Sequence, residues 1–217
     1  HRDFYDGDRV GVNPTLHIES GDSVIDLSYE YIDHQRFIDR GIPTGADGRP
    51  VEAFEKIVFG DPDINTTALK AHLWRASVQH SFSDTLKGNI AAFYGDYDKL
   101  YQNFYAAAYD QAQTPDEVTL DGYVDTTQRK HSILSANLVG ESEFAGIQHT
   151  LLAGVEFIDT SSDQDRWNTF WDTTDDDKET FSLTRNLGLE GGVGLNALGN
   201  VATNSFDRDI NDDTDVS

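Results

Sequence analysis

Aromatic side chains, most of which also carry a polar group, are the residues of this chain best suited to bind a ligand. They gather in two polar stretches, over 98–124 and 160–217, which are expected to be loops. A ring face covers apolar groups while a phenol or indole donates a hydrogen bond. The alternative is that single residues such as Tyr101 and Phe104 pack the base of a loop. The predicted ligand-binding residues are Tyr101, Phe104, Tyr105, Tyr109, Trp167, Phe170 and Trp171.

No catalytic site is predicted, so an enzyme is not expected. The sequence contains neither a nucleophile elbow nor a glycine-rich phosphate loop. The 7 histidines lack metal-ligand spacings such as H-x-x-E-H, and no metal site or cofactor is predicted. Asp207, Asp209 and Asn211 follow the start of a calcium loop, but position six is Asp212 in place of glycine. Solvation of an acidic surface is the preferred interpretation, with weak calcium binding as the alternative.

The rest of the chain is arranged around a β-hairpin predicted over 69–97. In its first strand, alternate residues from Trp74 to Phe82 are mostly apolar and those between them are polar, which is typical of a strand. The apolar band rises roughly 20 Å, the height of an outer-membrane barrel wall, and the strands approach roughly 14 residues, longer than in most soluble sheets. The predicted register pairs Phe82 with Leu86, His80 with Gly88, Val78 with Ile90, Ala76 with Ala92 and Trp74 with Tyr94.

A second hairpin is predicted over 126–159, with its turn at Ala145-Gly146. Further strands are expected over 10–19 and 24–37. Short turns alternate with long connections at 40–66, 98–124 and 160–217, as in outer-membrane barrels. In the second hairpin, the predicted register pairs Phe144 with Ile147, Leu138 with Ala153, Ala136 with Val155 and Leu134 with Phe157.

Composition agrees with a barrel that has polar loops. Only 37% of the residues are hydrophobic and the net charge is −23, which disfavours nucleic acid as a partner. The 12 Phe, 9 Tyr and 3 Trp are too many aromatic residues for a disordered chain. No apolar run reaches about 18 residues, so a helical membrane span is not expected. Because the sequence begins at His1 and contains no methionine, we expect an internal fragment of a longer mature protein.

The predicted fold class is therefore all-β, an antiparallel transmembrane β-barrel fragment of about six long strands in meander hairpins with long extracellular loops. Residues 1–159 are assigned to the barrel. Residues 160–217 are assigned to one long acidic extracellular loop, for whose last third a disordered tail is the alternative. About six strands cannot close such a barrel, so more strands are expected outside this sequence.

Several motifs resemble TonB-dependent siderophore receptors, particularly those of the ferrichrome type, over about residues 2–159. They are RDFYDG at 2–7, DRGIP at 39–43, FGDP at 59–62, HSFSD at 80–84, YQNFY at 101–105 and HTLLAGVE at 149–156. The resemblance implies a barrel of about 22 strands plugged by a further domain, in the outer membrane of a Gram-negative bacterium. It also implies active uptake of a ferric siderophore, for which a hydroxamate type is expected.

The resemblance further implies outer-membrane lipid as a partner, and TonB as a partner through the plug domain, which is absent from this sequence. Because a siderophore chelates the iron itself, the protein needs no metal ligands of its own. Two alternatives to the receptor remain. One is a passive porin-type channel, and the other is a secreted soluble β-domain that binds glycan or calcium. A plug domain upstream, and partition of the full protein into outer membranes, would distinguish the three.

Overall fold

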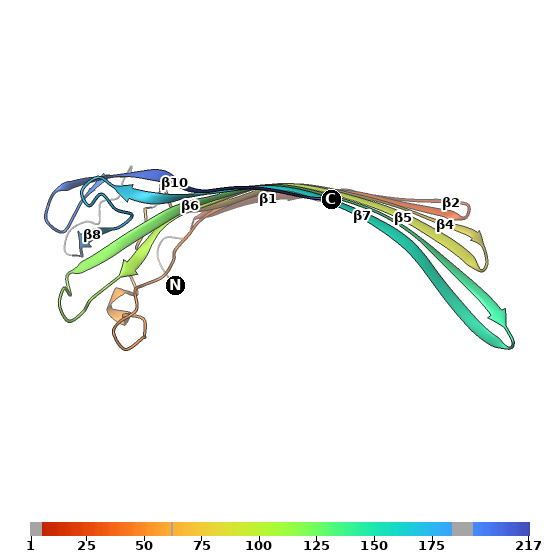
Figure 1. The fold of residues 1–217 in the computed structure, drawn as a ribbon, viewed down its shortest axis with the longest axis horizontal. Coiled ribbons are helices and arrows are strands. Elements are labelled where there is room, and N and C mark those ends of the chain that lie inside the picture. The colour runs from red at the N-terminus through yellow and green to blue at the C-terminus, as the bar shows by residue number, and fades with distance from the viewer. Residues whose placement is uncertain (1–5, 62, 184–192) are drawn as a thin grey trace.

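A computed structural model describes residues 6–61, 63–183 and 193–217, and most of them belong to one open antiparallel sheet (Figure 1). The strand order is β1-β3-β4-β5-β6-β7-β10-β9, with β2 also paired to β3 and β8 to β6. The strands are β1 (Gly7–Val12), β2 (Thr15–Ser20), β3 (Ser23–Phe37), β4 (Thr66–Ser83), β5 (Leu86–Ala108), β6 (Glu117–Phe144), β7 (Ile147–Trp171), β8 (Glu179–Ser182), β9 (Val193–Leu195) and β10 (Val201–Val216). A short 3-10 helix, η1, covers Glu52–Phe54.

The two ends of the sheet differ. Tight turns join the strands at one end, and the long connections gather at the other, where β8 and η1 lie beside the sheet (Figure 1). We call these the turn end and the loop end. The alternation of short turns with long connections that the sequence predicts is therefore confirmed. Among the described residues, no helix is long and apolar enough to cross a membrane.

The register of both predicted hairpins is confirmed over their length. Val78 lies opposite Ile90 and Trp74 opposite Tyr94, while Ala136 lies opposite Val155. One predicted pair, Phe82 with Leu86, is wrong. An irregularity between Ser81 and Ser83 places Ser83 opposite Leu86, because the strand takes one extra residue just before its turn.

β1 and β2 are two parts of one strand. Both pair with β3 in the same register, since Val12 lies opposite Tyr31 and Thr15 opposite Ser28. Between them, the carbonyl of Pro14 still accepts a hydrogen bond from the Tyr29 amide at 3.1 Å. Proline lacks an amide hydrogen, so the interruption falls where this strand loses a ladder bond, as is usual for a strand at the edge of a sheet.

The side of the sheet that carries Ile25, Val78, Ile90 and Val155 is uncovered, and we call it the apolar face. Val78 is 42% exposed, Ile90 56% and Val155 52%, and these residues share one row with Ile25 across β3 to β7. Toward the loop end, Tyr29, Trp74 and Tyr94 form an aromatic rim with centroid spacings of 5.2 and 5.5 Å. An exposed apolar band bounded by aromatic rings is typical of the lipid-facing side of outer-membrane barrel walls.

The strands continue beyond this rim farther than predicted. β5 ends at Ala108 and β6 begins at Glu117, so the connection expected over 98–124 is reduced to 109–116. The assignment of 160–217 to a single loop is also wrong, because β7 continues to Trp171 and β10 pairs with it antiparallel over Val201–Val216. Past the rim the strands mix exposed polar residues with a few buried ones such as Phe104 and Trp171, and the regular apolar alternation that identifies a strand in sequence is lost.

Asp207, Asp209 and Asn211 lie within β10, so they do not form the turn of a calcium loop.

A small hydrophobic cluster holds the connections to the loop end. Its buried members come from η1, β5, β6, β7, β8 and β10, and from the connection that contains Phe59. Asn65 anchors the 38–65 connection there, because its buried amide group donates to the carbonyls of Ile38 at 3.0 Å and Phe104 at 2.9 Å. The cluster comprises Phe54, Phe59, Phe104, Val118, Leu120, Trp171, Phe181 and Ala202.

Candidate ligand-binding site

The side of the sheet opposite the apolar face carries mostly polar residues, and we call it the polar face. At its loop end, alternate residues of β5 project from this face, namely Tyr101, Asn103 and Tyr105. On β6 they lie opposite Asp125, Tyr123 and Asp121 in that order. The pairing therefore places three tyrosines and two carboxylates on one small area of sheet.

Arg40, from the segment after β3, lies over this area. Its Nη1 donates to Tyr123 Oη at 2.7 Å and to Asn103 Oδ1 at 3.1 Å. Its Cζ stands 4.8 Å from the centroid of the Tyr105 ring, within the range of a cation–π contact. Arg40 is nevertheless exposed. The guanidinium is thus held in place from one side and remains accessible from the other.

A second arginine contacts the same ring. Arg166 on β7 has its Cζ 4.8 Å from the centroid of Tyr123 and forms a two-bond pair with Asp125, each bond 2.6 Å long. Tyr101 stacks on Tyr123 with centroids 5.9 Å apart and an interplanar angle of 20°. Tyr123 is therefore fixed by both arginines and by a neighbouring ring. We call Arg40, Tyr101, Tyr105, Tyr123 and Arg166 the arginine–tyrosine cluster.

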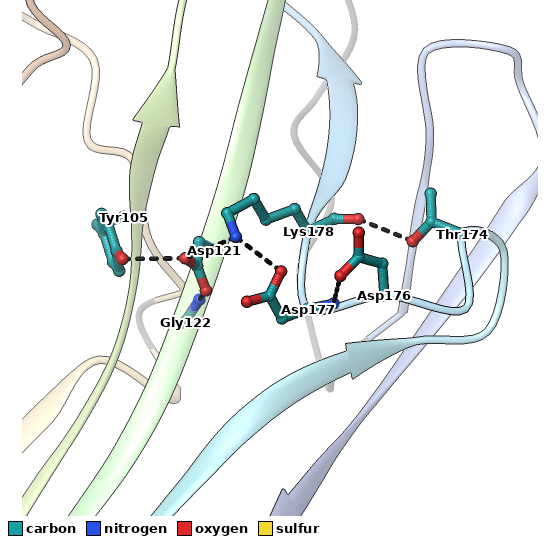
Figure 2. Close-up of polar contacts among 7 residues, drawn as sticks. All are labelled: Tyr105, Asp121, Gly122, Thr174, Asp176, Asp177 and Lys178. Carbon is teal, nitrogen blue, oxygen red and sulfur yellow. Dashed lines mark hydrogen bonds and ion pairs between the residues drawn. The ribbon is translucent and has the colours of Figure 1, made fainter. Parts of the chain in front are cut away.

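The connection that follows β7 reaches this cluster through Asp121 (Figure 2). Tyr105 Oη donates to Asp121 Oδ2 at 3.0 Å, and Lys178 Nζ lies 3.7 Å from the same oxygen. Lys178 also pairs with Asp177 at 2.7 Å, and this hydrogen bond lowers the pKa of the Asp177 carboxyl. Burial, and secondly the charge of Asp121, raise the pKa of Tyr105.

The structure places only two of the predicted ligand-binding residues, Tyr101 and Tyr105, in the arginine–tyrosine cluster. Phe104 and Trp171 have exposures of 0% and pack with their centroids 5.8 Å apart in the hydrophobic cluster. For Phe104 this is the loop-base packing named above as the alternative.

The remaining predicted aromatic residues lie apart from the cluster. Tyr109 packs edge-on against Phe54, and its hydroxyl donates to the Pro115 carbonyl. The ring of Trp167 lies 5.8 Å from the Arg208 Cζ. Phe170 is half-buried and lies opposite Ser205 of β10.

Sequence reasoning missed Arg40, Asn103, Tyr123, Asp125 and Arg166. The registers predicted for the two hairpins do not include the pairing of β5 with β6, which sets Tyr101 opposite Asp125 and Asn103 opposite Tyr123, because β5 and β6 belong to different hairpins. Arg40 reaches the cluster from a connection, which has no periodic pattern.

Over the ranges 6–61, 63–183 and 193–217, no three side chains of His, Asp or Glu are grouped so as to hold a metal ion. The site's chemistry is therefore that of aromatic faces, phenol hydroxyls and guanidinium groups. Such a set binds ligands that carry aromatic or anionic groups.

Long meander strands with an apolar band outside, and loops gathered at one end, are the fold of TonB-dependent receptor barrels, and this chain has the fold of one section of such a barrel. It superposes on the siderophore receptor PiuA from Acinetobacter baumannii with a TM-score of 0.67 and 16% identity, over 97% of this chain and 32% of that one. BauA, the ferric preacinetobactin receptor from the same organism, matches with a TM-score of 0.59 and 12% identity, over 83% of this chain and 26% of that one.

The ferripyoverdine receptor of the outer membrane of Pseudomonas aeruginosa matches with a TM-score of 0.57 and 14% identity, over 97% of this chain and 27% of that one. The chain thus spans about a third of these receptors or less. No protein-family model and no curated protein matches the sequence. The solved structures that it matches here are receptors and not enzymes.

Proposed function

We propose that this chain is part of an outer-membrane receptor that takes up a ferric siderophore with energy from the TonB complex. The observation that carries the proposal is the division of one sheet between two environments. An exposed apolar band with an aromatic rim suits lipid, while the opposite face ends in the arginine–tyrosine cluster. The similarity of the fold to siderophore receptors supports the same function.

In this function the polar face lines the barrel and the loop end lies outside the cell. Tyr101 and Tyr105 would contact the ligand together with Arg40, whereas Phe104 and Trp171 would hold the connections that surround it. Phe170 would act from the margin of the site on the polar face, whereas Tyr109 packs against the hydrophobic cluster and Trp167 lies with Arg208 on the opposite side of the sheet. The iron stays within its chelator, so the cluster needs ring faces and hydrogen-bond donors but no metal ligand.

Uptake of radioactive iron tests the proposal. A strain that lacks the full-length gene is compared with the complemented strain on a panel of ferric siderophores, in cells with and without TonB. The receptor predicts uptake of at least one chelate that requires both the gene and TonB. Uptake that needs the gene but not TonB would indicate the porin-type channel, and a product absent from outer-membrane fractions would indicate the soluble β-domain.

A further inference from the structure

Charge is divided unequally between the two faces of the sheet at the loop end. On the polar face, the rows that run from Arg36 to Arg166 and from His34 to Gln164, with the neighbouring segments, carry about as many cations as carboxylates. The cations there are Arg9, Arg36, Arg40, Lys99, Arg129, Arg166 and Lys178. The carboxylates there are Asp39, Glu117, Asp121, Asp125, Asp177, Asp207 and Asp212.

The continuation of the apolar face beyond its aromatic rim is more strongly acidic. One row there contains Asp33, Lys70, Asp98, Gln128, Asp163 and Asp213. The cations on this side are Lys70, Lys130 and Arg208, against Asp33, Asp96, Asp98, Asp163, Asp165, Asp213 and Asp215. A chain with a net charge of −23 and only 16 Lys and Arg residues therefore places a large share of its cations on the polar face.

Within the described residues, most of the cations on the polar face, Arg36, Arg40, Lys99 and Arg129 among them, have no carboxylate partner. Arg166 is neutralised by Asp125 and Lys178 by Asp121 and Asp177. Within the described part of the chain, Arg36 and Arg40 form no ion pair, although both are exposed. Arg40 is also positioned in advance by Tyr123, Asn103 and the Tyr105 ring, so an incoming ligand would not need to order it.

We infer that the ligand of this site is a ferric chelate with net negative charge, whose donor groups are catecholates or carboxylates, and not a neutral trihydroxamate. The inference rests on the proposed function and reverses the hydroxamate type expected from sequence resemblance. A guanidinium binds anionic oxygens through paired hydrogen bonds, and catechol rings can stack on the tyrosines. Within a barrel, low-dielectric walls focus the field of these cations on the approaching anion.

The test measures binding to the full-length receptor in outer-membrane vesicles. The two main probes are a ferric tris-catecholate, which is a trianion, and a neutral ferric trihydroxamate, and a ferric α-hydroxycarboxylate chelate separates charge from aromatic stacking. Arg40→Gln should raise the Kd of the tris-catecholate about 10- to 100-fold, because it removes a charge-assisted contact. Arg40→Lys, which keeps the charge but loses the planar fork, should fall between Arg40→Gln and the wild type.

Arg36→Gln is a second test variant, needed because Arg40 variants could also disturb the packing of the arginine–tyrosine cluster. Arg36 forms no hydrogen bond or cation–π contact with the residues of that cluster. Arg36→Gln should weaken binding of the anion about 2- to 5-fold and reduce the dependence of Kd on salt. Lys130→Gln is the matched control, because it removes one exposed cation from the opposite side of the sheet. Lys130→Gln should leave the Kd of the anionic chelate and its dependence on salt unchanged.

The outcomes separate the inference from the function on which it rests. Binding of the trihydroxamate as tight as that of the anions, or equal effects of Arg36→Gln and Lys130→Gln, overturns the inference and leaves a siderophore receptor in place. If no ferric chelate of any class binds, the proposed function itself fails.

Discussion

The hydroxyl of Tyr123 accepts a hydrogen bond from Arg40 at 2.7 Å, although the two residues are 83 positions apart in the chain. The bond joins the DRGIP segment after β3 to the middle of the wall formed by β5, β6 and β7. It makes Tyr123 the point at which the connection, the sheet and both arginines of the cluster meet.

Tyr123→Phe should weaken binding of the ferric ligand by about 3- to 10-fold. The variant keeps the ring that stacks on Tyr101 but removes the 2.7 Å hydrogen bond that holds the Arg40 guanidinium. The ligand must then order the guanidinium when it binds, which costs binding free energy. Tyr97→Phe makes the same chemical change elsewhere on the polar face and serves as the control. Equal affinities of the two variants in a vesicle binding assay would show that the bond does not position Arg40.

Gly122→Ala should destabilise the loop end by about 1–3 kcal/mol. A Cβ at Gly122 would stand 2.6 Å from both Phe104 Cδ1 and Thr169 Oγ1 and 2.7 Å from the Asn103 carbonyl, and the last of these is backbone and cannot rotate away. Gly140→Ala is the matched control, because its Cβ would meet only Leu86 at 3.7 Å. The measurement is the temperature at which the folded full-length barrel unfolds in detergent. A Gly140→Ala variant as unstable as Gly122→Ala would contradict the stated cause.

Val78→Lys should reduce assembly of the full-length protein in the outer membrane, at a cost of about 2–4 kcal/mol if Val78 lies near the middle of the bilayer. Gln79→Lys adds the same charge one residue away, on the polar face, and should be tolerated. The amounts of folded protein in outer-membrane fractions, and urea unfolding in lipid vesicles, measure the difference. Equal loss from both variants would show that the apolar face does not meet lipid.

Tyr105 should ionise above its ordinary pKa of 10.0. Burial is the first cause and the neighbouring Asp121 carboxylate the second, and Tyr105 lies beyond the aromatic rim and outside the lipid-facing segment. Because the pKa is raised on folding, its contribution to stability is present below pH 10 and is lost as the pH rises through the folded value. The difference in ultraviolet absorbance between the wild type and Tyr105→Phe, followed against pH, gives the pKa. Asp121→Asn should lower it, though not below 10, since burial persists.

The half of the fold that carries the apolar face could be predicted because its pattern is simple. Each strand there places apolar residues on alternate positions, so pairs such as Val78 with Ile90 and Ala136 with Val155 follow from sequence alone. The same rule fails beyond Trp74 and Tyr94. There the extension of β7 to Trp171 and the whole of β10 are rich in polar residues without regular alternation, and the sequence indicates an acidic loop.

The site was predictable only where it depends on residue type. Tyr101 and Tyr105 were recognised as candidate ligand contacts from their type, but the pairing with β6 that sets Asp125, Tyr123 and Asp121 beside β5 joins two separate hairpins and was not predicted. Arg40 and Arg166 depend on the course of a connection and on a strand extension, neither of which leaves a periodic signal. Phe104 was predicted as a ligand contact and is buried in the hydrophobic cluster, because a buried aromatic residue and a ligand-facing one have the same sequence appearance.

The constant pairing of β5 with β6 also limits which insertions and deletions this protein can accept during evolution. A single residue inserted in either strand between its aromatic rim and its loop end would turn Tyr101 and Tyr105, or Tyr123, to the opposite, more acidic side of the sheet. Insertions of two residues would preserve both sides. We therefore expect length changes among natural variants to occur in pairs within these strands, and freely only in segments such as 109–116.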